Sequence, residues 1–215
     1  MDFPTYKFLC QAATFIGVET TFCGDEFPFI VQNRTMAGQF SAHVMTSIIS
    51  GFIISFPYIL YEFWKFISPG LLEKERAKSR GFIFISSLLF FIGVLFGYYI
   101  ISPLSINFLG TYQVSSQVLN EIDLGSFISL VRSSAIASGI IFELPIIIYF
   151  LTKAGLVTPE SLVKYRKYAL VLVLVLAAII TPPDVASQII VAIPIVVLYQ
   201  VSIFISKIVV KNQGK

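Results

Sequence analysis

Long stretches of this chain carry no charged side chain, and this feature limits its fold more than any other. A helix needs about 20 apolar residues to cross the roughly 30 Å of hydrocarbon in a bilayer. Asp, Glu, Lys and Arg are absent from residues 35–61, 81–120, 168–183 and 185–206, and residues 124–152 contain only Arg132 and Glu143. We therefore expect an all-α, polytopic membrane protein with five spans, near residues 40–64, 81–103, 124–151, 167–181 and 186–207.

The composition argues against other common classes of protein. The chain is 56% hydrophobic and 13% charged, whereas soluble domains are about 25% charged. Disorder requires low hydrophobicity and high net charge, and the net charge here is only +3. The basic residues are dispersed, so we expect membrane lipids and no nucleic acid as partners.

The predicted span at 167–181 is shorter than the others. As a helix it would reach about 22 Å, so we expect the bilayer to be thinned locally around it. The alternative is a re-entrant segment that turns back at residues 181–184, which read Thr-Pro-Pro-Asp.

Positive charges predict the orientation, because cytoplasmic loops retain Lys and Arg. Twelve of the 15 basic residues fall at 65–80, 153–167 and 207–215, whereas Lys7 and Arg34 fall on the other side. We expect an extracytoplasmic loop at 1–39, a transmembrane region at 40–207 and a cytoplasmic tail at 208–215. An external residue 1 without a preceding helix or signal peptide predicts a missing N-terminal helix, hence six spans in the complete architecture.

Glu143 lies within an apolar segment, where an ionised carboxylate costs about 3 kcal/mol or more. A functional role is the first interpretation, and a neutral acid hydrogen-bonded to a neighbouring helix is the alternative. Arg132 would lie about 16 Å away along the same helix, so we expect it to extend to the outer interface instead. Pro145 removes a backbone hydrogen bond and should kink the helix beside Glu143.

Other prolines stand within or at the ends of predicted spans: Pro57, Pro103 and Pro194. Kinks at these positions would help the helices enclose a concave cup. The alternative is that membrane helices simply tolerate them.

The first cytoplasmic loop combines a Pro-Gly turn with mixed charge. Glu73 and Glu75 could receive a cationic partner there. On the residues alone, pairing with neighbours such as Lys74 and Arg76 on a solvated surface is the better interpretation.

The N-terminal segment holds both cysteines, Cys10 and Cys23. An oxidising compartment would allow a disulfide between them, and two free thiols are nearly as compatible with the sequence. The single histidine, His43, and the lack of a nucleophile motif or Gly-rich phosphate loop predict no enzyme activity, no cofactor and no metal site.

Four motifs occur in order along the spans and loops. They are FPYILYEFW at 56–64; FISPGL at 66–71 with Glu75-Arg76; FELP at 142–145; and TPPD at 181–184 with Ser187-Gln188 and AIP at 192–194. Together they resemble the TatC family, the core integral subunit of the twin-arginine protein translocase. The family's cytoplasmic N-terminal segment and first span have no counterpart here, so the resemblance places Met1 in the first outer loop.

The resemblance implies a cup-shaped receptor in the bacterial cytoplasmic (inner) membrane. Such a receptor binds the Arg-Arg signal peptides of folded precursors. It exports them with the single-span TatA and TatB subunits, driven by the proton-motive force, and forms a homo-oligomer within the complex.

The same resemblance assigns site residues. Glu75 matches a position in the signal-peptide patch, with Phe66 and Arg76 beside it. Glu143 matches the intramembrane glutamate that faces the hollow of the cup. The remaining positions match a docking patch for partner helices, Thr181 and Gln188, and an acidic residue of the outer loop, Asp184.

Two other functions remain open from the residues alone. A proton-coupled secondary transporter could load and release its proton at Glu143, although inverted repeats and a second deep acid would be expected. An intramembrane hydrolase would need a nucleophile and base pair that the sequence does not supply.

Overall fold

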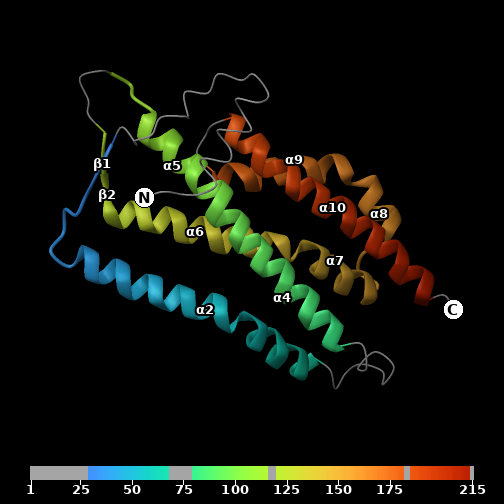
Figure 1. The fold of residues 1–215 in the computed structure, drawn as a ribbon. Helices are drawn as coiled ribbons and strands as arrows, with labels where there is room; N and C mark the ends of the chain where they lie inside the picture. The colour runs from blue at the N-terminus through green and yellow to red at the C-terminus, as the bar shows by residue number, and fades with distance from the viewer. Residues whose placement is uncertain (1–28, 68–78, 116–119, 182–184, 214–215) are drawn as a thin grey trace, which may run out of the picture.

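Apolar segments fold as helices because a helix satisfies its own backbone hydrogen bonds, as hydrocarbon surroundings require. The computed structural model describes residues 29–67, 79–115, 120–181 and 185–213 (Figure 1). Its longer helices are α2 (Gly38–Ile67), α4 (Ser79–Phe96), α5 (Ser102–Thr111), α6 (Leu124–Phe142), α7 (Leu144–Lys153), α9 (Arg166–Ile180) and α10 (Val185–Gln213).

Four helical segments are long and apolar enough to cross a membrane: Gly38–Lys65, Ile83–Thr111, Leu124–Lys153 and Ser187–Lys211. Helix α9 has 15 residues, which reach about 22 Å. The polytopic helical fold is therefore confirmed, and a membrane crossing by α9 stays a prediction. Helix α10 continues to Gln213 rather than ending near residue 207.

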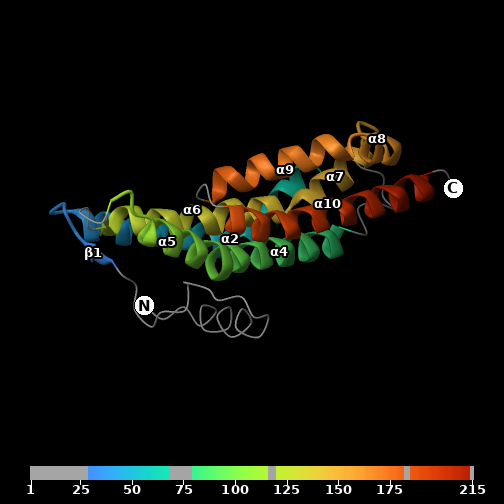
Figure 2. The ribbon, with the colours of Figure 1, turned by 90° about the horizontal axis from the view of Figure 1, so that it is seen from above.

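Helix α6 packs against α2 and α4 on one side of the molecule, and α9 lies beside α10 on the other (Figures 1 and 2). Buried aliphatic residues of α9 and α10, among them Ala177 and Val191, form the larger core cluster together with Ile101. Many apolar side chains nevertheless face outward, including Ile54 of α2, which is 75% exposed. Such an apolar exterior suits lipid rather than water.

Glycines allow α4 and its extension to approach α6 closely. A Cβ atom on Gly93 would lie 2.8 Å from the carbonyl oxygen of Ser138, and one on Gly97 would meet backbone atoms of Ser134 and Ala135. Small residues of this kind are typical of helix contacts in membranes, where close backbone approach supplies the packing energy.

The regular α-helix is interrupted near two of the prolines at which kinks were predicted. The helix breaks at Glu143, between α6 and α7, with Pro145 in the first turn of α7. A π-helical turn, η2 (Gly97–Ile101), precedes Pro103. Helices α2 and α10 run through Pro57 and Pro194 without a break, and the concave cup stays a prediction.

A short two-stranded ribbon adds to the predicted all-α fold. Strand β1 (Ile30–Gln32) pairs in parallel with β2 (Glu121–Asp123), and Ile30 lies opposite Glu121. Arg34 reinforces the ribbon with a 2.8 Å ion pair to Glu121. Three-residue strands are too short to show the alternation on which a sequence-based prediction depends.

Different elements lie at the two ends of the bundle. Strands β1 and β2 lie at one end, and the short helix α8 (Pro159–Lys164) lies with the C-terminus at the other (Figures 1 and 2). The sequence analysis did not predict α8. The sequence signal for α8 is a capping box, in which Thr158 and Ser161 exchange hydrogen bonds, together with Pro159 in the first helical turn.

Candidate functional site

The break between α6 and α7 places Glu143 inside the helix bundle. Its side chain is only 9% exposed. The hydroxyl of Ser86, on α4, donates a 2.6 Å hydrogen bond to Oε2 of Glu143. The carboxyl is therefore held by a neighbouring helix, the contact that the second interpretation of the sequence anticipated.

Only one oxygen of this carboxyl is hydrogen-bonded within the described residues. The other oxygen, Oε1, is buried and has no hydrogen-bond partner there. Phe90, one helical turn after Ser86 on α4, stacks on Phe56 of α2 with ring centroids 3.6 Å apart. The half-satisfied carboxyl leaves an acceptor, or a proton, available inside the bundle.

Hydroxyl groups provide further polarity inside the helices. Ser134 and Ser138 are buried on α6, and Thr152 of α7 donates a 2.9 Å hydrogen bond to Ser206 of α10. The sequence analysis missed Ser86 and these residues. A Ser86-Ser87 pair inside a charge-free run was the available signal, because polar residues in such a run tend to face another helix.

Thr181 and Gln188, expected to form the docking patch, are both engaged within the chain. The Thr181 hydroxyl is buried and donates to the carbonyl of Ala177 at 2.8 Å. Gln188 Nε2 donates to the carbonyl of Leu174 at 3.0 Å and so ties α10 to α9. Each residue retains an acceptor oxygen for a partner.

A groove of about 650 Å³ lies next to Thr181. Its polar lining comes mainly from the N-cap residue Asp123 and from the start of α6, where hydroxyls recur at a helical spacing: Ser126, Ser129 and Ser133. Sequence reasoning did not identify this row, although its spacing of three and four residues places the serines on one face of α6.

Arg132 lies where the start of α2 packs on α6, and its extension to the outer interface stays a prediction. Its Nε and Nη1 atoms are buried without a hydrogen-bond partner among the described residues. The first turns of α2 cover α6 at this level, and the side chain lines a cavity between the two helices.

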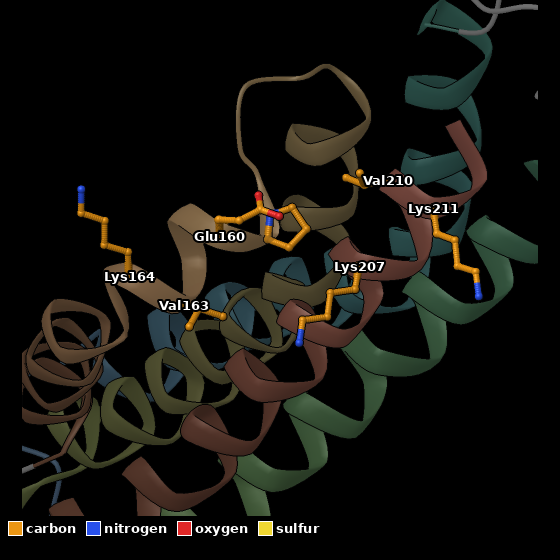
Figure 3. A pocket seen from close by; sticks show the side chains of 7 residues that line it. Glu160, Val163, Lys164, Lys207, Val210 and Lys211 are labelled. Atoms are coloured by element: carbon orange, nitrogen blue, oxygen red, sulfur yellow. The ribbon is translucent and has the colours of Figure 1, made fainter. Parts of the chain in front are cut away.

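A second groove, of about 670 Å³, separates α8 from the end of α10. Three lysines line it together with Glu160 and apolar residues: Lys164, Lys207 and Lys211. Their amino groups point in different directions rather than toward one centre (Figure 3). This arrangement is that of a solvated basic surface.

Several predicted site residues lie outside the described part of the chain: Cys10, Cys23, Glu75, Arg76 and Asp184. Phe66 falls in the last turn of α2. Within the described residues, no group of three His, Cys, Asp or Glu side chains could hold a metal ion.

Comparison with known proteins gives consistent matches. Residues 5–194 match the family model described as Sec-independent protein translocase protein (TatC). A protein of that name from Blattabacterium sp. subsp. Periplaneta americana is 51% identical over 183 residues, covering 85% of this chain and 69% of the relative. Another from Aquifex aeolicus is 42% identical over 173 residues, covering 79% and 71%.

A solved structure is also similar. A crystal structure described as the twin-arginine translocase receptor TatC superposes with a TM-score of 0.68 at 34% identity. The match covers 97% of this chain and 89% of that one.

Proposed function

This chain belongs to the TatC family of Sec-independent protein translocase proteins, and from that premise we propose that it is the receptor that binds Arg-Arg signal peptides. It exports folded precursors with TatA- and TatB-type single-span subunits, driven by the proton-motive force. The family is one of protein transport and not of enzymes. The observation that carries the proposal is the continuous family match over residues 5–194, which includes the loop of Glu75.

The proposed location is the bacterial inner membrane, with the C-terminus in the cytoplasm and residue 1 outside. The charges of the described residues support this orientation. Lys164, Lys207 and Lys211 gather at the end that holds α8 and the C-terminus, whereas Glu121 and Asp123 lie at the ribbon end. Positive charge is retained on the cytoplasmic side during insertion.

Signal-peptide capture is assigned to Glu75, with Phe66 and Arg76 beside it. A guanidinium presents a planar fork of donors that matches a carboxylate in two parallel hydrogen bonds. An acidic side chain in the first cytoplasmic loop is therefore a suitable acceptor for one arginine of the signal.

Later steps are assigned to the membrane interior. Glu143, held by Ser86, provides the one buried carboxyl among the described residues. Thr181, the C-cap residue of α9, lines the groove that holds the serine row, and Gln188 on α10 bonds to α9. A polar partner helix would satisfy their remaining acceptor oxygens at about 1 kcal/mol each.

The test is export of a folded reporter bearing an Arg-Arg signal, in cells that lack their own TatC protein and carry this chain. We expect Glu75→Lys to abolish both export and crosslinking of the signal, because a like charge replaces the acceptor. Glu160→Lys is the control, since Glu160 is an exposed acid on α8 and its reversal should leave export unchanged.

Unchanged crosslinking in Glu75→Lys would contradict the receptor assignment. Uptake of a small solute that depends on this chain, without reporter export, would instead favour a proton-coupled transporter that uses Glu143.

A further inference from the structure

A cavity of about 370 Å³ lies between the starts of α2 and α6. Arg132 lines it from α6, and Thr35, Ser41 and Met45 line it from the α2 side. The volume is about twelve times the roughly 30 Å³ that one water occupies in the liquid, so a larger group fits.

The cavity contains a positive charge that the described chain does not neutralise. A guanidinium stays protonated in proteins, and Nε and Nη1 of Arg132 have no hydrogen-bond partner among the described residues. Among the described residues, no acidic side chain lines this cavity. A buried charge without a partner is costly, so an anion from outside the described chain should occupy the site.

Among the described residues, the acids of the neighbouring elements are used elsewhere. Asp123 accepts hydrogen bonds from the backbone N–H groups of Gly125 and Ser126 through Oδ2. Glu121 forms the ion pair with Arg34, and Glu143 is bound to Ser86.

We infer that Arg132 binds the phosphodiester of a phospholipid headgroup in this cavity. A guanidinium fork matches two phosphate oxygens, and the hydroxyls of Thr35 and Ser41 add donors on the opposite wall. Met45 is 49% exposed, and Phe40 on the same helix is 73% exposed. The cavity therefore opens toward an apolar surface on which acyl chains can lie.

The depth of the site suits a headgroup. Both neighbouring membrane spans begin here, at Gly38 and Leu124. Arg132 lies about 12 Å further along its helix, and helical side chains lean toward the N-terminus, so its charged end is carried back toward the interface. In the proposed orientation this is the outer leaflet.

The test uses the purified full chain in dodecyl maltoside and native mass spectrometry. Dioctanoyl phosphatidylglycerol is the lipid probe, and inorganic phosphate is the free-anion probe. We expect Arg132→Gln to weaken lipid binding about tenfold or more, because a charge-assisted pair is lost. Arg166→Gln, at an exposed arginine in the first turn of α9, should bind lipid like the unchanged chain.

Arg132→Lys separates recognition from folding. It keeps the charge and removes the planar fork, so we expect lipid binding between those of the unchanged chain and Arg132→Gln. Thermal unfolding without lipid should show both variants folded. Arg132→Gln removes a charge that has no partner among the described residues, and Arg132→Lys keeps that charge.

Three results would overturn the inference. The first is equal lipid binding by Arg132→Gln and the unchanged chain. The second is displacement of the lipid by inorganic phosphate at equal concentration, which would make a free anion the ligand. The third is a dimer of the chain that carries no lipid at this site and is lost in Arg132→Gln.

Discussion

Glu143 and Ser86 are polar side chains on apolar membrane spans, and they bond to each other. The carboxyl is nearly buried, and one of its oxygens depends on the Ser86 hydroxyl. The sequence predicted a buried carboxyl because the surrounding run is apolar. It could not identify Ser86, which is 57 positions away along the chain and reaches Glu143 only through the packing of α4 against α6.

Removal of that hydroxyl should destabilise the fold. In Ser86→Ala, Oε2 of Glu143 loses its described donor, and we expect the free energy of unfolding to fall by about 1–3 kcal/mol. Denaturant unfolding in detergent micelles would measure it. Ser87→Ala is the matched control, because among the described residues the Ser87 hydroxyl bonds only to the carbonyl of Ile83 in its own helix. A change of similar size in both variants would contradict the assignment.

Among the elements, the contact between α6 and the helix formed by α4 and η2 depends on glycine. Gly93, Gly97 and Gly139 leave room for the partner helix at successive levels. Charge-free runs predicted the helices. They could not predict η2, since a π-turn departs from the 3.6-residue period on which helix prediction rests.

Gly97→Ala tests this contact between helices. Its Cβ would fall on backbone atoms of Ser134 and Ala135, which cannot move aside as a flexible side chain can. We expect a loss of about 1–3 kcal/mol in unfolding free energy, measured by thermal or denaturant unfolding in micelles. Gly51→Ala is the control: no heavy atom lies within 4 Å of its added Cβ, so it should be neutral or stabilising by up to about 1 kcal/mol.

For the whole molecule, the separation of charge between the two ends is the feature that the sequence predicted most directly. Lys and Arg positions can be read from a list of residues, whereas the order in which helices pack cannot. The packing of α10 against α7, the ribbon and the cavity at Arg132 all depend on contacts between distant segments. The sequence analysis therefore described the spans better than the surfaces between them.

Cysteine labelling would test the proposed orientation. With Cys10 and Cys23 replaced by Ser, single cysteines are introduced as Val114→Cys and Leu156→Cys, at side chains that are 88% and 74% exposed. A membrane-impermeant maleimide should label the first in intact spheroplasts and the second only after permeabilisation, as the positive-inside rule requires. The reverse pattern would place the C-terminus outside.

The small ribbon also sets an order of events during synthesis. Its ion pair joins positions 87 residues apart, and at 5–20 residues per second the second partner emerges about 4–17 s after the first. During that interval the backbone of β1 has no β2 to pair with, while α2, α4 and α5 are already synthesised. Closure of the ribbon therefore cannot precede the emergence of the start of α6, and the rate of translation sets the earliest time at which the two strands meet.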